Sequence, residues 1–306
     1  QKITLATALV VLFSVSFFSY INYLQAKNQV VQQAEANIYE VGNNLSAYVS
    51  NWISTKQTIL AAASGFADER SNLNSVLGQG QKSGDFLYMY IGTVNGEMIM
   101  VPQEELPSDY DPRTRPWYTQ SKQQNRDIIT PPYVDASSGD LVVSFARPTA
   151  LGVIAADVKM TNIANEILNV SLGESGEAFM INENNAILVH GKEDYFEQDL
   201  TALVTSGKFT DKITTLNFEG RNILGAVFTA KGTPWSIVVK VEKSEALAEL
   251  RSLTIRNIIS TLLTIIVVTL VVGLLINALL NPLLKCCFTS PSTKNCPAID
   301  VSEFPL

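Results

Sequence analysis

The segment Asp109 to Tyr118 reads DYDPRTRPWY and gathers guanidinium, indole and phenol groups into ten residues. Pro112 and Pro116 interrupt it, and the segment therefore predicts a loop, because proline lacks a backbone N–H donor and disfavours the helical conformation of the residue before it. The polar groups of such a loop can donate hydrogen bonds to an anionic group such as a carboxylate. The segment offers such donors on its two arginines, its tryptophan and its two tyrosines, with Arg115 and Trp117 two residues apart.

A second set of side chains, further along the chain, can bind a cation. Tyr133 and Asp135 are two residues apart, and in an extended chain residues at this spacing face the same side. Asp157 lies in the segment LGVIAADVKM, which is otherwise mostly apolar. We therefore expect a strand that is buried on both faces and a buried Asp157 carboxylate, which is costly unless it has a partner.

Each of these residues also has a purely structural interpretation. Arg147 or Lys159 can supply the cation that pairs with Asp157. Asp135 precedes a hairpin turn, where aspartate is common, and Arg115 can bind a carboxylate only to fix its own loop. Taken together, however, two carboxylates, an arginine, an indole N–H and several phenols match both ends of a zwitterion, because carboxylates bind an ammonium group and arginine binds a carboxylate.

The elements that position these residues begin with a long helix. From Leu24 to Phe66 the chain has hardly any proline or glycine, and apolar residues recur at three- and four-residue steps, which is typical of one face of a helix. These residues are Ile38, Val41, Leu45, Val49, Trp52 and Ile53. The helix is expected to pack on the domain or to pair with its copy in a dimer.

After this helix the period changes to that of a sheet. Asp85 to Val101 reads as a strand, an Asn95-Gly96 turn and a second strand, and Pro131 to Pro148 reads as another hairpin. A second round of strands starts at Gly176, and the likeness between FLYMYIGTVNGEMIM and AFMINENNAILV indicates an internal duplication. The sequence therefore predicts an α+β fold in which the long N-terminal helix precedes two tandem sheet modules.

Two uncharged apolar runs, Thr4 to Tyr20 and Asn257 to Leu284, lie near the two ends of the chain. Each is long enough for a transmembrane helix, which needs about 20 residues. No small-residue cleavage site follows the first run, so we interpret it as a membrane helix rather than as a signal peptide. The expected segments are residues 1–23 (first transmembrane helix), 24–66 (long helix), 67–170 and 171–252 (the two modules), 253–284 (second transmembrane helix) and 285–306 (tail).

Composition argues against several classes of protein. The net charge of -7 disfavours nucleic acid or an anionic surface as a partner. The cysteines all follow the second apolar run, so the large domain has none, as suits an oxidising exterior. With His190 as the single histidine, no four-ligand zinc site and no cofactor are expected.

An enzyme with Asp135 and Asp157 as an acid/base pair is conceivable, but no nucleophile or metal motif supports it, so the chain is predicted not to be an enzyme.

The order Y-x4-R-x-W-Y, then Y-x-D, then a single aspartate resembles the amino-acid-binding signature of double Cache ectodomains. These occur in bacterial methyl-accepting chemotaxis receptors, and the resemblance is to Vibrio-type receptors for amino acids and taurine. The matching residues are Tyr110, Arg115, Trp117, Tyr118, Tyr133, Asp135 and Asp157. The resemblance covers residues 24 to 284 and implies PAS-like sheet modules, of which the membrane-distal one binds the ligand and the membrane-proximal one relays.

The resemblance also implies a role for each matching residue and a place in the cell. The ligand carboxylate would be held by Tyr110, Arg115 and Trp117. Its amino group would be held by Tyr133, Asp135 and Asp157, and Tyr118 would frame the site. The implied protein is a homodimer in the bacterial inner membrane, with a large periplasmic domain that senses amino acids.

Two further expectations concern the ligand and the tail. A sensor for a dicarboxylate or a polyamine, in a kinase- or cyclase-type receptor, is the alternative function; the two acidic residues count against a dicarboxylate and the Arg-Trp loop counts against a polyamine. A chemotaxis receptor continues with a HAMP module and a coiled-coil rod, whereas residues 285–306 contain prolines and no heptads. The sequence therefore predicts a short atypical cytoplasmic tail and a truncated signalling part.

Overall fold

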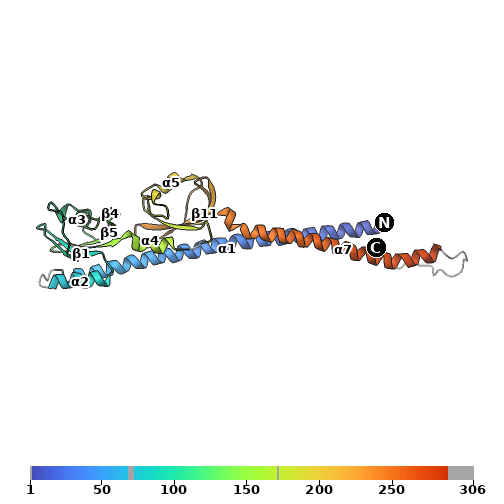
Figure 1. Ribbon diagram of the computed structural model, residues 1–306, viewed down its shortest axis with the longest axis horizontal. Coiled ribbons are helices and arrows are strands. Elements are labelled where there is room, and N and C mark those ends of the chain that lie inside the picture. Colours follow the sequence, from blue (N-terminus) through green and yellow to red (C-terminus); the bar gives the residue numbers. More distant parts are fainter. Residues whose placement is uncertain (1, 68–71, 171, 289–306) are drawn as a thin grey trace. The chain divides into compact units, whose positions relative to one another are not determined.

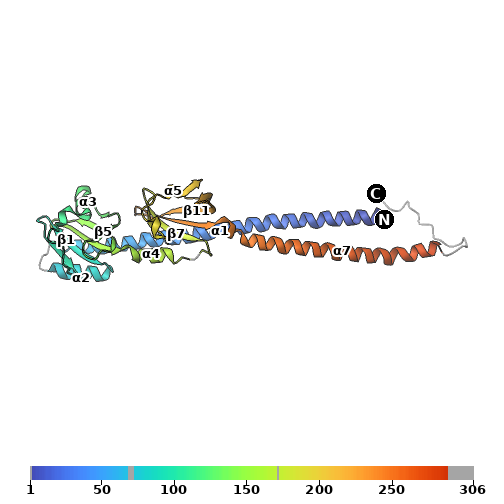
Figure 2. The ribbon, with the colours of Figure 1, turned by 45° about the horizontal axis from the view of Figure 1, so that its top comes forward.

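The computed structural model describes residues 2–67, 72–170 and 172–288. The chain divides into two compact units, one made of Gln1–Val30 and Ala248–Leu306 and the other of Val31–Leu247. Figures 1 and 2 show the helices and strands of both units from two directions.

A long helix, α1 (Lys2–Ser64), supplies one side of the core of the unit Val31–Leu247. No proline interrupts this stretch, and apolar side chains at four- and seven-residue steps along one face are buried, as in an amphipathic helix. These side chains are Ile38, Leu45, Val49, Ile53 and Leu60. The predicted long helix over residues 24–66 is therefore present as the later part of α1.

The first sheet module is one antiparallel sheet of order β2-β1-β6-β5-β3, in which β4 also pairs with β5. Its first hairpin turns at Asn95-Gly96 as predicted, and Gly96 has a φ of 87°, which glycine adopts without steric cost. The strands are β1 (Tyr88–Thr93), β2 (Met98–Val101), β3 (Ile128–Ile129), β4 (Tyr133–Val134), β5 (Leu141–Pro148) and β6 (Gly152–Lys159). The helical segments are α2 (Leu73–Ser83), η2 (Pro112–Thr114), α3 (Pro116–Gln124) and α4 (Met160–Leu168).

The second sheet module repeats this arrangement, with strand order β8-β7-β12-β11-β10-β9. Its first four strands in this order follow the pattern of β2-β1-β6-β5, which supports the predicted internal duplication. The strands are β7 (Glu177–Asn182), β8 (Ile187–Val189), β9 (Val204–Ser206), β10 (Thr214–Phe218), β11 (Arg221–Thr229) and β12 (Trp235–Glu242). The helical segments are η3 (Glu193–Tyr195), α5 (Leu200–Leu203) and α6 (Lys243–Ala246).

α1 packs against both sheets, so one continuous core serves the two modules. Trp52 on α1 meets Phe145 on β5, with ring centroids 6.0 Å apart. Phe228 on β11 lies against Gly42, and its ring atoms come within 2.2 to 2.4 Å of the place that a Cβ atom would take there. Glycine at position 42 therefore lets the helix approach the second sheet closely, as dense core packing requires.

Replacement of Gly42 by alanine is expected to lower the free energy of unfolding by about 1–3 kcal/mol, because the added methyl group must displace the Phe228 ring. Gly78→Ala in α2 is the matched control, since its methyl group would lie 3.7 Å from Val101 Cγ1, an ordinary contact. Alanine favours a helix over glycine by about 0.5–1 kcal/mol. The melting temperature, measured by circular dichroism, should therefore fall for Gly42→Ala and rise for Gly78→Ala. A higher melting temperature for Gly42→Ala would contradict this packing.

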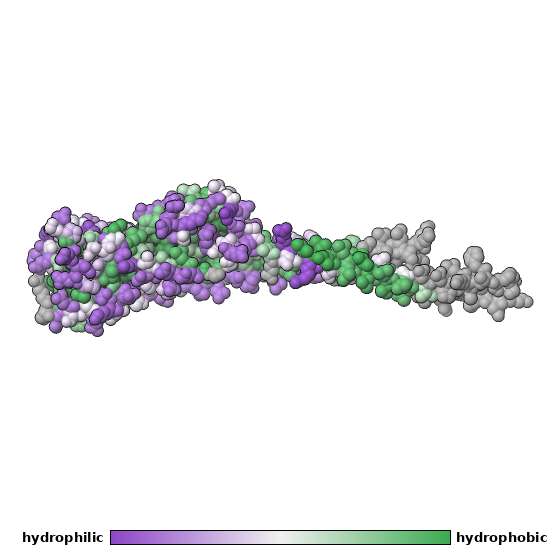
Figure 3. All heavy atoms as spheres, in the orientation of Figure 1, coloured by the Kyte–Doolittle hydropathy of each residue, from purple (hydrophilic) through white to green (hydrophobic). Residues whose placement is uncertain are grey.

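Among the described residues, one helical stretch, Lys243–Leu275, is long and apolar enough to cross a membrane. Most of it belongs to α7 (Ala248–Phe288), on which side chains such as Ile259, Leu263 and Leu270 are more than 60% exposed. Figure 3 shows this stretch as an apolar band. A helix that is apolar all round and uncovered by protein is typical of a membrane span.

The first predicted transmembrane helix remains a prediction. Its residues form the start of α1, where Ser19 Oγ accepts a hydrogen bond of 3.2 Å from Thr261 Oγ1 of α7, so the two helices touch within their unit. The predicted tail 285–306 lies outside the described residues from position 289 onward.

Candidate functional site

The first module places a buried carboxylate at the centre of its sheet. β6 lies between β1 and β5 and is buried along nearly its whole length. Asp157 is only 2% exposed, and it is in register with Tyr88 on β1 and Ser144 on β5. Directly opposed residues of neighbouring antiparallel strands face the same side of the sheet, so these three side chains share one face.

No cation pairs with this carboxylate among the described residues, so the structural ion-pair interpretation of Asp157 is wrong. Arg147 donates two hydrogen bonds of 2.7 Å to Asp127. Lys159 Nζ lies 2.6 Å from Asp140 Oδ2. Both candidate cations therefore have other partners, and the buried charge of Asp157 calls for a cation from elsewhere.

Hydroxyl groups converge on one oxygen of Asp157. Tyr90 Oη donates to Oδ1 at 2.6 Å, and Ser144 Oγ donates to the same atom at 2.5 Å. Tyr133 Oη lies 2.6 Å from Ser144 Oγ and 3.4 Å from Oδ1. None of these bonds uses Oδ2, so that oxygen keeps its lone pairs for another donor.

The surroundings of Asp157 bring the pKa of its carboxyl group close to neutral pH. Burial raises the pKa of Asp157 to about 7, because the ionised form loses its hydration, while hydrogen bonds from Ser144 and Tyr90 oppose the rise. Burial and the charge of Asp157 also raise the pKa values of Tyr90 and Tyr133, so these phenols keep their protons and remain donors. A cation placed beside Asp157 would favour its ionised form.

The donor-rich segment is partly helical, which corrects the predicted loop. Pro112 opens η2 and Pro116 opens α3, because proline is well accommodated at the first position of a helix, where a backbone N–H would have no intrahelical partner. Arg115 stands between the two helices in an extended conformation. Trp117 and Tyr118 lie in the first turn of α3 and are both buried.

The two arginines of this segment have different surroundings. Arg113 is exposed and pairs with Asp111 at 2.7 Å. Arg115 faces no carboxylate at ion-pair distance within the described ranges, and its guanidinium carbon lies 5.5 Å from the ring centre of Tyr110. Burial raises the pKa of Tyr110, while the charge of Arg115 and the indole N–H of Trp117 oppose the rise. Arg115 is thus a cation without an anion, held by an aromatic neighbour.

Trp117 packs tightly over the sheet. It is 1% exposed, and its ring meets that of Tyr90 edge-on at 4.9 Å. It also covers Gly92 on β1, where the indole Cη2 comes within 2.6 Å of the place that a Cβ atom would take. Any larger residue at position 92 would push the indole away, so glycine is needed here for close approach.

These side chains line a small cavity of ≈ 10 Å³, well below the volumes usual for small-molecule sites, so a ligand of amino-acid size would have to move the lining apart. Six of the seven predicted residues line it, namely Tyr110, Arg115, Trp117, Tyr133, Asp135 and Asp157. The seventh, Tyr118, is not part of this lining and packs behind Trp117, with ring centroids 5.7 Å apart. The other lining residues are Tyr88, Tyr90, Met98, Met100, Leu106 and Ser137.

Asp135 stabilises a turn, as its structural interpretation predicts, and it also lines the cavity. Its Oδ1 accepts hydrogen bonds from the backbone N–H groups of Ser137 at 3.1 Å and Ser138 at 2.7 Å, the pattern of an Asx turn. Its Oδ2 takes no part in these bonds. The turn therefore fixes the direction of a second carboxylate that lines the cavity.

Sequence reasoning missed Ser144, although a signal for it exists. Ser144 is fully buried in the apolar strand LVVSFARP, and a polar residue inside an apolar strand is the same signal that points to Asp157. Met98, Met100 and Leu106 carry no such signal, because buried methionine and leucine are typical of any core.

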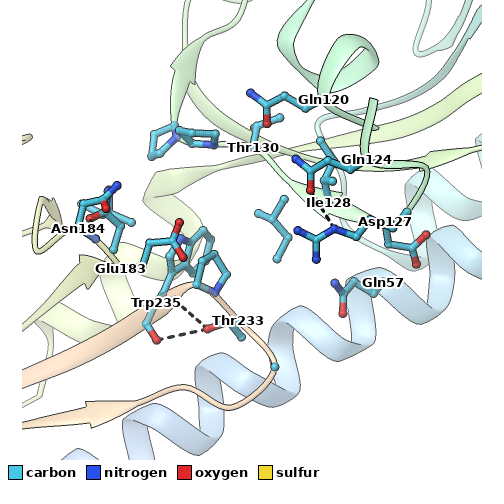
Figure 4. A pocket seen from close by; sticks show the side chains of 18 residues that line it. Gln57, Gln120, Gln124, Asp127, Ile128, Thr130, Glu183, Asn184, Thr233 and Trp235 are labelled. Atoms are coloured by element: carbon cyan, nitrogen blue, oxygen red, sulfur yellow. Dashed lines mark hydrogen bonds between the residues drawn. The ribbon is translucent and has the colours of Figure 1, made fainter. Parts of the chain in front are cut away.

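A larger recess of ≈ 580 Å³ is lined by residues of α1 and of both sheet modules. Figure 4 shows its side chains, among them the amides of Gln57, Gln120 and Gln124. Arg126 donates a hydrogen bond of 2.9 Å to Gln124 Oε1 there. None of the lining residues that the structure describes is a buried ionisable group without a partner, so the smaller cavity is the better candidate site.

The second module has a cation where the first has Asp157. Lys240 is the sixth residue of β12, as Asp157 is of β6, and β12 pairs with β7 and β11 as β6 pairs with β1 and β5. Lys240 Nζ lies 2.8 Å from Glu177 Oε2 and 4.9 Å from the ring centre of Phe218. The buried charge of Lys240 is therefore neutralised within the protein itself.

Comparison with known proteins gives the same family as the site residues. The dCache_1 model, a Cache domain, matches residues 23–250. The methyl-accepting chemotaxis proteins McpG of Pseudomonas putida and PctB of Pseudomonas aeruginosa are each 28% identical to the chain, over 270 and 278 residues. The alignments cover 85% and 87% of this chain but 43% and 44% of those proteins, so the chain spans less than half the length of these relatives.

A solved structure supports the same assignment. The ligand binding domain of the Pseudomonas aeruginosa amino acid chemoreceptor PctB, in complex with L-Arg, matches with a TM-score of 0.64 and 25% identity, covering 71% of this chain and 98% of that chain. These relatives are sensor domains and not enzymes, in agreement with the sequence prediction. The chain therefore belongs to the dCache_1 family of Cache domains and is homologous to the ligand-binding domains of Pseudomonas amino-acid chemoreceptors.

Proposed function

We propose that the cavity of the first module binds free α-amino acids through both of their charged groups. The observation that carries this proposal is that a buried carboxylate without a cation, Asp157, lines the same cavity as an arginine without an anion, Arg115. The ammonium group of an amino acid would neutralise Asp157, and its carboxylate would pair with the guanidinium fork of Arg115.

The other predicted residues support these two contacts. On the ammonium side, Asp135 adds a carboxylate and Tyr133 adds a hydroxyl. On the carboxylate side, Tyr110 and Trp117 would donate hydrogen bonds beside those of Arg115, and Tyr118, which packs on the indole, would frame the site. Charge-assisted hydrogen bonds of about 1.5–3 kcal/mol each, less the entropy of binding, are compatible with micromolar affinity, or about -8 kcal/mol.

The chain is, in this proposal, the sensor part of a chemotaxis receptor in a bacterial inner membrane. PctB and McpG are methyl-accepting chemotaxis proteins, and the PctB domain has been solved with L-Arg. Two transmembrane helices would flank a large periplasmic domain, and α1 would pair with its copy in a homodimer. A ligand signals only if it binds one conformation better than another, and the second module would relay that change.

The proposed segments keep the boundaries expected from the sequence. The first module, residues 67–170, would be membrane-distal, and the second, residues 171–252, membrane-proximal. Residues 24–66 would form the long periplasmic helix between the first transmembrane helix, 1–23, and this pair. The second transmembrane helix would comprise residues 253–284 and would lead to the tail 285–306.

A thermal-shift screen of the full chain in detergent tests this function. A compound that binds only the folded state stabilises it by about 2.7 kcal/mol at a concentration of 100 times Kd. We expect amino acids to raise the melting temperature, and taurine tests whether a sulfonate can replace the carboxylate. If dicarboxylates or polyamines stabilise the chain and amino acids do not, the alternative sensor function is correct.

Amino-acid affinity is expected to fall about tenfold between pH 8 and pH 6. The ligand needs ionised Asp157, whose pKa is raised to about 7 in the free protein, so below pH 7 protons compete with the ammonium group. Free amino acids keep both of their charges between pH 6 and pH 8. The expected change of affinity with pH is therefore caused by a group of the protein and not by the ligand. Isothermal titration calorimetry at pH 6, 7 and 8 measures it, and affinity that is constant or higher at pH 6 would contradict the role of Asp157.

A further inference from the structure

One part of the cavity lining is apolar, in contrast to the parts that carry Asp157 and Arg115. Met98 and Met100 on β2 are in register with Gly92 and Tyr90 on β1, so they face the same side of the sheet as Tyr90. Leu106, in the segment after β2, lines the cavity with them. These three side chains are called the methionine corner below.

The methionine corner lies across the sheet from the acidic groups. β1 separates β2 from β6, which carries Asp157. Neighbouring strands are about 4.8 Å apart, so β2 and β6 are separated by about 10 Å. An amino acid whose ammonium group lies at Asp157 and whose carboxylate lies at Arg115 would need its side chain, rather than its charged groups, to reach this corner.

The charges around the cavity disfavour an acidic side chain. Two carboxylates, Asp135 and Asp157, line the cavity. Burial raises the pKa of Tyr88, a hydrogen bond with Ser137 opposes the rise, and the nearby carboxylates Glu104, Asp135 and Asp140 add to it. Arg115 is the single cation of the lining as the structure describes it, and the ligand carboxylate would use it. A second carboxylate on the ligand would therefore meet apolar or negative surroundings.

We propose that the methionine corner is the side-chain subsite, and that the site prefers amino acids with a flexible apolar side chain, such as leucine or methionine, over glycine and over the acidic amino acids. This inference rests on the proposed binding of amino acids at Asp157 and Arg115. Methionine is unbranched and polarisable, so it adapts to apolar groups of different shape. The subsite therefore selects by apolar surface rather than by one exact shape.

Titration calorimetry of the full chain in detergent with leucine, methionine, glycine and glutamate tests this preference. Burial of a leucine-sized side chain is expected to make leucine and methionine at least about tenfold tighter than glycine. Glutamate is expected to bind at least about 100-fold more weakly than leucine. Met98→Ala should weaken leucine about tenfold and leave glycine within about twofold. Val94→Ala, on the exposed turn of the same hairpin, is the control and should change neither affinity.

The outcomes separate this inference from the function on which it rests. If no amino acid binds, the proposed function fails. If glycine or glutamate binds as tightly as leucine, amino-acid binding stands but the methionine corner is not the subsite. Equal weakening of leucine and glycine by Met98→Ala also overturns the inference, because it would mean general damage to the cavity. Leu106→Ala repeats the comparison from a different segment, in case Met98→Ala fails to fold.

Discussion

Asp157→Asn is expected to abolish amino-acid binding while the chain stays folded. Asparagine has nearly the same shape as aspartate and can still accept hydrogen bonds from Tyr90 and Ser144, but it carries no charge to pair with an ammonium group. Loss of one partner of a buried ion pair costs about 3–5 kcal/mol, which corresponds to a roughly 200- to 5,000-fold higher Kd. Calorimetry and the thermal shift both measure this loss.

The same variant should make the ligand-free protein at least as stable as the original at pH 8. Asp157 has a raised pKa in the folded state, so the unfolded chain releases this proton first and the folded state loses stability as pH rises from about 4 to about 7. Asparagine removes this loss. Asp140→Asn is the control, because Asp140 belongs to the same module but pairs with Lys159. The affinity of this variant for amino acids should stay within about threefold of that of the original protein. A stable Asp157→Asn variant that still binds amino acids would refute the assigned role.

Arg115→Ala is expected to have the second-largest effect, with an affinity loss of about 100-fold or more. Arginine binds a carboxylate through two parallel hydrogen bonds, and charge-assisted bonds contribute about 1.5–3 kcal/mol each. Arg115→Lys keeps the charge but lacks the planar fork, so it should recover only part of the affinity. Calorimetry with the amino acid that ranks first in the screen measures both variants.

Arg113→Ala is the matched control for this experiment. Arg113 lies two residues away in the same segment, but it is exposed and pairs with Asp111, so its loss should leave the affinity within about twofold. The account would be contradicted if Arg113→Ala and Arg115→Ala weakened binding equally, because the effect would then belong to the local fold and not to the contact with the carboxylate.

Much of the fold could be predicted from the sequence because its signals are local. The apolar steps around Val49 and Ile53 predict the helix, and Asn95-Gly96 predicts the first hairpin, since each depends on a few neighbouring residues. The proline-rich segment was less predictable. Pro116 begins a helix rather than preventing one, because the effect of proline depends on whether it stands at the first position or inside.

The candidate site could be predicted as a set of residues but not as a network. The odd carboxylate in an apolar strand points to Asp157, yet its hydroxyl partners come from three other strands, through Tyr90, Tyr133 and Ser144. Such pairings depend on strand register, which a single sequence does not reveal. The methionine corner was unpredictable for another reason: methionines that line a cavity have the same pattern as methionines in a core.

The two modules differ in how a buried charge at the same place of their sheets is neutralised. Asp157 and Lys240 take the same place in their central strands. Asp157 has no cation beside it among the described residues, whereas Lys240 lies within hydrogen-bond distance of Glu177. In the proposed function, this difference in charge would separate a module that takes a ligand from one that neutralises its own buried charge.

The central claim, that one cavity binds both charged groups of an amino acid, is tested most directly by titration calorimetry of the full chain with three compounds of one carbon skeleton. These are the amino acid that ranks first in the screen, the amine that lacks its carboxylate and the acid that lacks its ammonium group. The account predicts binding of the amino acid, with at least about 100-fold weaker binding of the other two, because each leaves one charge of the cavity without a partner. Equal binding of the amine or of the acid would contradict it.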